Sequence, residues 1–400
     1  MSKILFLSNG HGEDLSGSLL AKQLINRGNS VDALPLVGQG LHYKKESIKI
    51  IGKTREFITG GLGYNSFKGR IYEILGGQII YLLKKLYLSY KLRKKYDFYI
   101  VVGDIVPIFF AWFSRKDFFT YLVAYSSHYE GKLNLPWPCK LFLLSKKAKK
   151  IYSRDNLTAF DLTRQLRKKV SFLGNPFMDK FSLMKKKSDT FDLSVGLFSG
   201  SRFPEILDNL LLILEVLEGI SNFNYFGSIE FNFAIVNKLS TEQIKQILNK
   251  RNWIYLEKTS KNYALEFKYQ SIKANFKWNH FEEILFESIF VISMAGTATE
   301  QAIGLGKPVV QIEGKGPQFT KSFAEAQRRL LGKYVFCATN YKTKKDKINQ
   351  TINLILKVLY LIKIDKEFLN SCLDNGKLRL GESNACIKIV DEINSLMKND

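Results

Sequence analysis

The feature that most constrains the fold of this chain is a strand–turn–helix pattern that occurs once in each half. A short apolar run ends in a turn of small residues, and helical spacing follows. In the first half, residues 3–7 lead into the turn 8–14; in the second half, residues 193–198 lead into the turn 199–202. Short apolar runs that alternate with helices are typical of buried parallel strands. The pattern therefore predicts an α/β fold built from doubly wound parallel sheets.

The length and the spacing of these elements predict two domains. A chain of 400 residues exceeds what one hydrophobic core usually organises. Further strands are expected at 31–35, 98–102, 118–124, 231–236, 290–293 and 307–312, and a helix at 300–305. The polar stretch 185–190 predicts a linker. We expect an N-terminal domain over 1–185, a C-terminal domain over 191–380, and a last helix within 381–400 that packs back on the first domain.

Composition and charge restrict the class of protein. The four cysteines form no CxxC pair, so we expect no metal or redox site and a reducing, cytoplasmic location. The opening apolar run stops at Ser8, and no run of about 20 apolar residues follows, so neither a signal peptide nor a membrane span is expected. The net charge of +23 predicts an acidic partner, although a lysine-rich composition alone could explain much of it. Without a nucleic-acid motif, we expect no nucleic-acid partner.

The turn after the first strand is a candidate ligand loop. It contains Asn9, Gly10, His11, Gly12, Glu13 and Asp14. Small residues after a strand let the backbone approach a ligand, and the start of a helix favours anions. We expect this loop to contact an acceptor or a phosphate, with His11 and Glu13 as candidate catalytic groups. The alternative is that Glu13 and Asp14 only complement the helix dipole.

Asp104 is the first candidate for a general base. It follows the buried run 98–102 and Gly103, so it is expected at the mouth of a cleft between the domains. Partial desolvation there would raise its pKa and suit it to accept a proton. The alternative is that Asp104 caps the next helix.

Two turns in the second half are candidates for binding an anionic donor. The residues expected to bind it are Gly200, Ser201, Arg202, Gly296, Thr297, Ala298, Thr299, Glu300, Gln301 and Gln318. Backbone amides at 296–299 suit phosphate, and Arg202 can form a bidentate contact with a diphosphate. Glu300 or Gln301 could bind ribose, and Gln318 a sugar hydroxyl. The alternatives are an ordinary turn with a surface arginine and, around Gln318, a solvated loop.

Three motifs resemble those of a known family. Residues 198–206, 173–179 and 296–302 look like the corresponding motifs of lipid-A-disaccharide synthase, and the chain is similar to the group called lipid-A-disaccharide synthase-related proteins. Gly103-Asp104 falls where that synthase has its essential aspartate, and the opening loop also resembles the glycosyltransferase that completes lipid II. The resemblance implies a glycosyltransferase-B architecture with two Rossmann-like domains, a donor bound mainly by the C-terminal one, and no metal or other cofactor.

The motifs also depart from the family pattern. The family glutamate aligns with Gln301, so Glu300 is displaced by one residue, which rotates a helical side chain by about 100°. Asn175 stands where the synthase usually has histidine. We therefore expect transfer of a sugar from a nucleotide-sugar donor, UDP-linked by resemblance, to a lipid or lipid-linked acceptor. The rival interpretations are a sugar-nucleotide epimerase and a non-catalytic nucleotide- or lipid-binding protein.

A membrane face is expected in the first half. Residues 71–96 mix apolar and aromatic side chains with a basic end, and 112–116 and 135–139 add similar material. Such segments lie in membrane interfaces, where anionic headgroups attract lysine. We expect an anionic membrane surface as a partner and a peripheral location on the inner face of the cytoplasmic membrane. The alternative is a core helix with a solvated lysine face.

Overall fold

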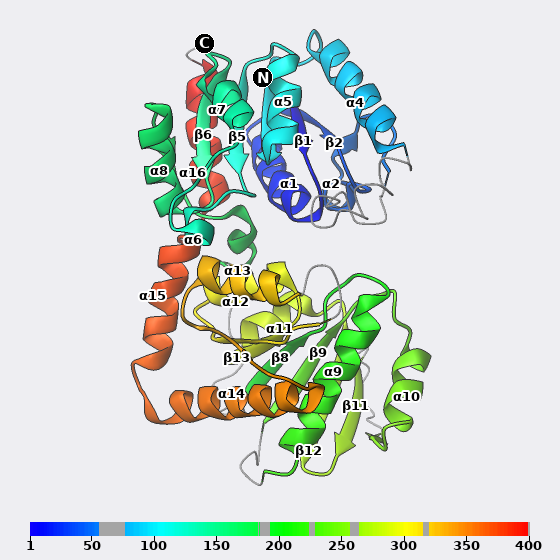
Figure 1. Cartoon of the computed structure of the whole chain (residues 1–400). Coiled ribbons are helices and arrows are strands. Elements are labelled where there is room, and N and C mark those ends of the chain that lie inside the picture. The colour runs from blue at the N-terminus through cyan, green and yellow to red at the C-terminus, as the bar shows by residue number, and fades with distance from the viewer. Residues whose placement is uncertain are drawn as a thin grey trace. The chain divides into compact units, whose positions relative to one another are not determined.

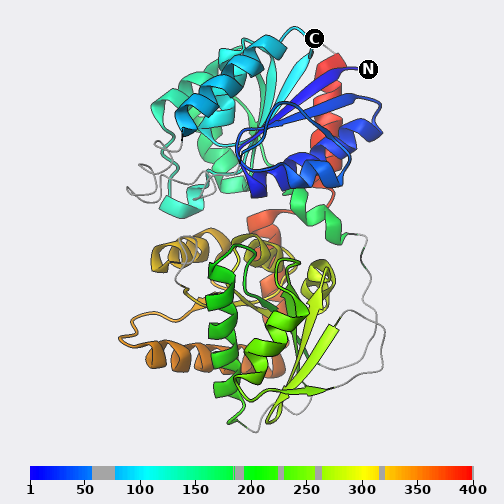
Figure 2. The ribbon, with the colours of Figure 1, turned by 90° about the vertical axis from the view of Figure 1, so that its right-hand side faces the viewer.

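The polypeptide forms two units, each built on its own sheet (Figures 1 and 2). In the computed structural model, unit 1 comprises Met1–Ser182 and Leu380–Asp400, and unit 2 comprises Leu183–Arg379. The structure describes residues 1–55, 77–182, 184, 193–223, 229–256, 264–314 and 320–398, apart from the side chains of His11 and Glu130. The chain thus leaves unit 1 close to the expected linker and returns to it near its end.

Unit 1 contains a parallel sheet whose seven described strands have the order β3-β2-β1-β4-β5-β6-β7. The strands are β1 (Lys3–Ser8), β2 (Ser30–Pro35), β3 (Lys49–Ile50), β4 (Phe98–Gly103), β5 (Phe118–Leu122), β6 (Ala148–Ser153) and β7 (Val170–Ser171). The helices are α1 (His11–Asn26), α2 (Leu41–Lys45), α4 (Gln78–Leu92), α5 (Ile105–Phe113), α6 (Ser127–Glu130), α7 (Trp137–Leu144), α8 (Asn156–Leu166), η2 (Pro176–Phe181) and α16 (Ala385–Lys398). With β1 between β2 and β4, the sheet is doubly wound, as the sequence predicts.

Helices cover both faces of this sheet. Successive strand residues point to opposite faces, and β1 is apolar on both. Leu5 and Leu7 join the core under α4, α5, α7 and α8, whereas Ile4 and Phe6 join the core under α1, α2 and α16. The last helix therefore packs beside α1 on one face of unit 1 (Figure 2).

The segment around η2 anchors the C-terminal part of the chain to unit 1. Asp179 accepts the Ala385 and Cys386 backbone N–H groups at 2.9 and 2.7 Å, which caps α16. Asn175 is 1% exposed and donates from Nδ2 to the Leu380 carbonyl at 2.8 Å. The motif over 173–179 therefore holds the returning chain in place.

Unit 2 contains a sheet whose eight described strands have the order β10-β11-β12-β9-β8-β13-β14-β15. The strands are β8 (Ser194–Phe198), β9 (Glu230–Ile235), β10 (Ile254–Leu256), β11 (Ala264–Tyr269), β12 (Ile272–Trp278), β13 (Phe290–Ser293), β14 (Val309–Gln311) and β15 (Val335–Cys337). The helices are α9 (Glu205–Ile220), α10 (Thr241–Asn249), α11 (Phe281–Glu287), α12 (Gly296–Gly304), α13 (Lys321–Leu331), α14 (Lys344–Ile364) and α15 (Phe368–Leu380). β11 runs antiparallel to β10 and β12, and the other pairings are parallel.

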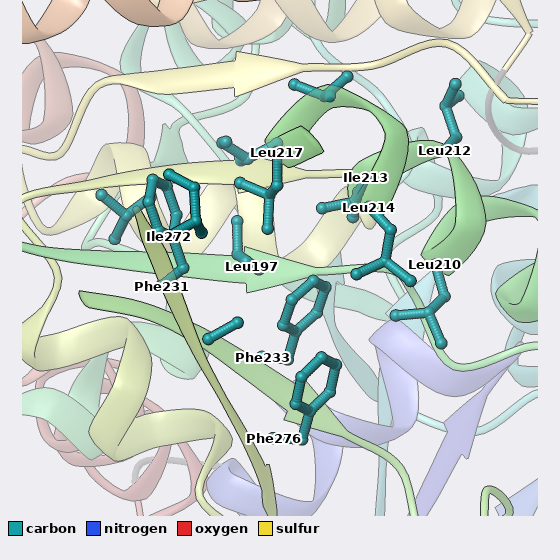
Figure 3. Close-up of a cluster of buried hydrophobic side chains, with 14 of the residues drawn as sticks. Leu197, Leu210, Leu212, Ile213, Leu214, Leu217, Phe231, Phe233, Ile272 and Phe276 are labelled. Carbon is teal, nitrogen blue, oxygen red and sulfur yellow. The ribbon is translucent and has the colours of Figure 1, made fainter. Parts of the chain in front are cut away.

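The core of unit 2 fixes the strand ends that carry its predicted site. α9 buries Leu210, Ile213 and Leu217 against the sheet (Figure 3). Phe233 and Phe276 stack with their ring centroids 4.5 Å apart. Each fully buried side chain of this kind contributes about 1.5–3 kcal/mol, so β8, β9 and β12 form a firm base beneath α9.

The predicted strands are confirmed within two residues at their ends, whereas two helices begin earlier than expected. α1 begins at His11 rather than at Leu15, and α12 begins at Gly296 rather than at Glu300. In both cases the small residues of the turn themselves adopt helical geometry, so the turn is the first turn of the helix.

Candidate active-site residues in the two units

The carboxyl ends of β1 and β4 carry the predicted residues of unit 1. These strands are neighbours, so the turns that follow them lie side by side. Asn9 Nδ2 donates to Asp104 Oδ2 at 3.1 Å. A Cβ placed on Gly103 would lie 3.5 Å from Asn9 Cβ and 3.5 Å from Glu13 Cγ. The structure thus brings Asn9, Glu13 and Asp104 together at one edge of the sheet.

Asp104 is half-buried, and both of its carboxylate oxygens accept hydrogen bonds. Oδ1 accepts the Val106 N–H at 2.9 Å and thereby caps α5, while Oδ2 accepts from Asn9. Burial raises the pKa of Asp104 above its usual range, and the bonds from Val106 and Asn9 oppose that rise. The capping alternative is therefore confirmed, and each oxygen retains a lone pair for a substrate hydroxyl.

Two glycines are required by the path of the backbone at these strand ends. Gly10 and Gly103 both have φ of +145°, a region that favours glycine. A Cβ on Gly10 would lie 3.3 Å from Glu13 Oε2, and one on Gly103 would lie 3.2 Å from Pro107 Cγ. Gly12 differs, because a Cβ there would have no described atom within 4 Å.

The acidic residues in the first turn of α1 lie at different depths. Glu13 is half-buried, whereas Asp14 is only 2% exposed. Ser8 Oγ donates to Asp14 Oδ1 at 2.6 Å. Burial raises the pKa of Asp14 to about 7, and the Ser8 hydrogen bond opposes the rise. Asp14 therefore lies beneath the loop. The side chain of His11 lies outside the described part of the chain.

In unit 2, the turn 199–202 lies against the start of α12. β8 and β13 are neighbours, and the Met294 N–H donates to the Phe198 carbonyl at 2.8 Å. A Cβ on Gly200, whose φ is +95°, would lie 3.4 Å from the Met294 carbonyl oxygen. Ser201 is exposed and Arg202 is half-buried. Arg202 and the α12 start thus belong to adjacent turns.

The start of α12 suits an anion. Among the described residues, no side chain caps it, and no acidic residue occupies its first turn. Thr299 is fully buried, and its hydroxyl donates to Ser293 Oγ at 3.0 Å or to the Ala295 carbonyl at 2.9 Å. This hydroxyl therefore forms hydrogen bonds within the turn and stabilises it. The first backbone N–H groups of a helix have no intrahelical acceptor, so they can bind a phosphate.

Glu300 and Gln301 occupy different sides of α12. Gln301 is 3% exposed and Ala298 is also buried, whereas Glu300 is half-exposed and Thr297 is exposed. Neighbouring side chains on a helix are about 100° apart, so the side that buries Gln301 leaves Glu300 accessible. Glu300 is thus the more accessible of the two side chains, although the family resemblance aligns the family glutamate with Gln301.

Two buried amides that the sequence analysis missed support these turns. Asn209 Nδ2 donates to the Ser199 carbonyl at 3.0 Å. Gln327 Nε2 donates to the Gly296 carbonyl at 3.3 Å, and its Oε1 accepts from Gln311 Nε2 at 2.8 Å. Asn209 could have been noticed in the sequence, because it is a polar residue within the apolar stripe of α9. Gln327 had no comparable signal.

Gln318, the candidate for a sugar hydroxyl, lies within 315–319, outside the described residues. Its role stays a prediction. Within the described ranges, no group of three or more His, Cys, Asp or Glu side chains is placed to hold a metal ion.

Exposed apolar side chains and exposed lysines occur together on three helices of unit 1, α4, α5 and α7, and this set is here called the apolar–basic face. Its apolar members are Ile79, Ile80, Leu83, Tyr87, Phe113, Trp137, Leu141 and Leu144, and its lysines are Lys84, Lys91 and Lys140. α5 contacts both α4 and α7, with the Tyr90 and Phe113 rings 5.8 Å apart and the Trp112 and Phe142 rings 4.7 Å apart. Residues 71–76 of the expected membrane segment are not described. In the part of the chain that the structure describes, no helix combines the length and apolarity that a membrane crossing requires.

Comparisons with known proteins reveal similarity in structure but not in sequence. No family model matches the chain, and no curated protein matches it. MnaA of Staphylococcus aureus with UDP aligns with a TM-score of 0.60 and 14% identity, over 100% of this chain and 97% of that one. The glycosyltransferase of kitacinnamycin aligns with a TM-score of 0.61 and 10% identity, over 99% and 98%. The UDP-GlcNAc 2-epimerase of Neisseria meningitidis bound to UDP-GlcNAc aligns with a TM-score of 0.55 and 13% identity, over 98% and 100%.

These alignments extend over both units. The sheet of unit 1 is parallel as the sequence predicts, and that of unit 2 is parallel except for β11, which the sequence did not predict. The chain therefore has the glycosyltransferase-B fold.

Proposed function

We propose that this protein is a glycosyltransferase that moves a sugar from a UDP-linked donor to a lipid or lipid-linked acceptor. The observation that carries the proposal is the pair of adjacent turns in unit 2. Gly200 lies against the Met294 carbonyl just before α12, Arg202 follows in the same turn as Gly200, and no described side chain caps the start of α12. A glycosyltransferase is among the structures that the chain resembles. UDP or UDP-GlcNAc accompanies two others, which supports UDP as the nucleotide.

In this proposal the donor diphosphate binds the first turn of α12. The backbone amides there and the guanidinium of Arg202 donate hydrogen bonds to its oxygens. Thr297 and Glu300, on the accessible side of the helix, contact the ribose hydroxyls. When the bond between sugar and phosphate breaks, negative charge grows on the leaving diphosphate, and these donors stabilise that charge.

Asp104 acts as the general base. It takes the proton of the acceptor hydroxyl while that oxygen attacks the anomeric carbon and the diphosphate leaves. A raised pKa suits a base that works near neutral pH, and the hydrogen bond from Asn9 orients Oδ2. Glu13 is the alternative base, because its Cγ would lie 3.5 Å from a Cβ on Gly103, the residue before Asp104. His11 is a further candidate.

A lipid acceptor accounts for the apolar–basic face of unit 1. Tyr87 and Trp137 would enter the membrane interface, while anionic headgroups attract Lys84, Lys91 and Lys140 at roughly 1 kcal/mol each. The enzyme then works as a peripheral protein on the inner face of the cytoplasmic membrane. The resemblance to lipid-A-disaccharide synthase-related proteins fits a glycolipid product.

Thermal unfolding with nucleotides tests the donor site. A ligand of the folded state raises the unfolding midpoint by mass action, so UDP is expected to raise it more than GDP or ADP. Arg202→Ala should remove most of this rise. Lys268→Ala is the matched control, because Lys268 is exposed on β11 of the same unit. No rise with any nucleotide would move the assignment to a non-catalytic binding protein.

A sugar-nucleotide epimerase is the second candidate, because an epimerase bound to UDP-GlcNAc shares the fold. An epimerase acts on the nucleotide sugar itself and needs no acceptor. Incubation of UDP-GlcNAc in D2O separates the two reactions, because inverting a carbon centre by proton abstraction exchanges its hydrogen. Deuterium in the recovered nucleotide sugar supports an epimerase. Release of UDP that requires an added lipid extract, without deuterium in the remaining donor, supports the transferase.

A further inference from the structure

A buried polar network lies beneath the loop of unit 1. Its members are Ser8, Asp14, Tyr43 and Lys85. We propose that this network is a positioning device that holds Asn9 and Glu13 against Asp104. The inference rests on the proposed function, in which Asp104 is the base, and it names residues that act on that base through others.

The first part of the network is a chain of hydrogen bonds between three elements. Tyr43 of α2 donates from its hydroxyl to Ser8 Oγ at 3.1 Å, and Ser8 Oγ donates to Asp14 Oδ1 at 2.6 Å. Tyr43 and Ser8 are fully buried. A Cβ on Gly17 would lie 2.1 Å from the Tyr43 hydroxyl oxygen. The glycine in α1 therefore makes room for the ring that reaches Ser8.

The second part is a buried cation from α4. Lys85 is 3% exposed, and its Nζ donates to the Pro35 carbonyl at 3.0 Å. Pro35 lies opposite Ser8 in the neighbouring strand, so the ammonium group reaches the strand end that carries the network. Burial lowers the pKa of Lys85 to about 8, and attraction to Asp14 opposes this fall. Each of these buried charges therefore stabilises the other.

The charged neighbours of Asp14 come from two helices. Glu13 of α1 raises the pKa of Asp14, and Lys85 of α4 lowers it. Tyr43 of α2 remains neutral, because burial and the charge of Asp14 raise its pKa well above the usual value. An ionised Asp14 thus depends on Lys85 for its compensating charge.

The anchors flank the residues that they position. Ser8 precedes Asn9, and Asp14 follows Glu13. The Asp14 N–H also donates to the Gly10 carbonyl at 2.7 Å. Tying Ser8 to Asp14 therefore closes the loop at both ends, so that Asn9 keeps its hydrogen bond to Asp104.

Loss of the Lys85 charge should raise the pKa of Asp104. Without it, the pKa of Asp14 rises further, and the Pro35 carbonyl opposite Ser8 loses its hydrogen-bond donor. The strand end that carries Ser8 is then held less firmly, and the loop relaxes. The hydrogen bond from Asn9 stabilises the ionised form of Asp104, so weakening it raises the pKa of Asp104.

Carbon NMR of protein labelled at aspartate Cγ tests this without any substrate. The Asp104→Asn and Asp14→Asn variants identify the two resonances by their loss. Lys85→Met is expected to raise the titration midpoints of both groups, that of Asp104 by at least about half a pH unit. Tyr43→Phe should raise the Asp104 midpoint less. Lys84→Met, which removes the neighbouring exposed lysine of α4, should change neither.

Lys85→Arg keeps the positive charge and is expected to leave both midpoints close to those of the wild type. If Lys85→Met does not fold, Tyr43→Phe and Lys85→Arg still compare a broken network with a retained one. An Asp104 midpoint that Tyr43→Phe and Lys85→Met leave unchanged would overturn the proposal. That result would leave the UDP test of the donor site intact, because the titration involves no nucleotide.

Discussion

α1 and α12 begin alike, each after a parallel strand and small residues, yet their first turns carry opposite chemistry. α1 has Glu13 and Asp14 in its first turn, whereas α12 has no acidic residue there. A helix start attracts negative charge. α1 places its own acidic side chains there, and α12 places none. In the proposed function, the same strand–turn–helix arrangement therefore serves proton transfer in unit 1 and anion binding in unit 2.

The turns beside these two helix starts, which follow β4 and β8, also differ in charge. In unit 1, the strand beside β1 is followed by Asp104, and Gly103 at the end of that strand lies near Glu13. In unit 2, the strand beside β13 is followed by Arg202. The side chains at the strand ends, rather than the backbone path, thus distinguish an acidic edge from one that suits a diphosphate. Each prediction below alters one side of this contrast.

The largest effect is expected from Asp104→Asn. Loss of a general base typically slows a reaction by about 10²–10⁴-fold. Asparagine caps a helix about as well as aspartate, so the thermal midpoint should hardly change while sugar transfer falls. The matched control is Asp97→Asn, because Asp97 stands at the other end of β4 and also accepts a backbone N–H, that of Lys3 at 2.8 Å. Full activity in Asp104→Asn would mean that Asp104 is not the base and would favour Glu13 instead.

The second prediction concerns Asp14, whose pKa burial raises to about 7. Between pH about 4 and 7 the folded protein keeps this proton while the unfolded chain loses it. Folding stability should therefore fall as pH rises, by up to about 1.4 kcal/mol per pH unit. The amide in the Asp14→Asn variant cannot ionise, so urea unfolding at pH 5 and pH 7 should show a smaller loss. Equal pH dependence in both proteins would contradict a buried, protonated Asp14.

Sequence reasoning succeeded where the signal is local. β1, β4 and β8 are apolar runs ended by small residues, and these runs alone indicate buried parallel strands. That was enough for the fold class and for placing the 9–14 loop and Asp104 after strands, whereas the hydrogen bond from Asn9 to Asp104 is a finding of the structure. The antiparallel hairpin at the edge of unit 2 was missed, although β11 alternates buried Leu265 and Phe267 with exposed Ala264 and Lys268.

Sequence reasoning was insufficient where a distant part of the chain decides the outcome. The rotation of α12 depends on packing of Ala298 and Ala302 against the sheet, so an alignment could not establish that Gln301 is buried. Lys85 lies in a helix that resembles a membrane-interface segment with solvated lysines. Its burial follows from Pro35 and Asp14, which come from a strand and a helix far earlier in the chain.

The third prediction places an acidic residue in the first turn of α12, as α1 has in its own first turn. Thr297 is exposed in the first turn of α12. Thr297→Glu should preserve or slightly raise stability, because a carboxylate near a helix start contributes about 0.3–1 kcal/mol. It should weaken UDP binding by at least about tenfold, since the new charge repels the diphosphate. Calorimetric titration measures this, with Thr297→Gln as the neutral control. Unchanged binding in Thr297→Glu would mean that UDP does not use this helix start.

The smallest effect distinguishes Glu300 from Gln301. If Glu300 binds the ribose, wild-type protein should prefer UDP over 2′-deoxy-UDP by about 2- to 10-fold, because a hydrogen bond at this half-exposed position contributes about 0.5–1.5 kcal/mol net. Glu300→Gln should reduce that preference, and Gln301→Leu should retain it. Competition binding with the two nucleotides gives the ratio directly. A preference lost in Gln301→Leu but kept in Glu300→Gln would mean that α12 rotates when it binds, because Gln301 is buried in this structure. The contrast between α1 and α12 would then lie in mobility as well as charge.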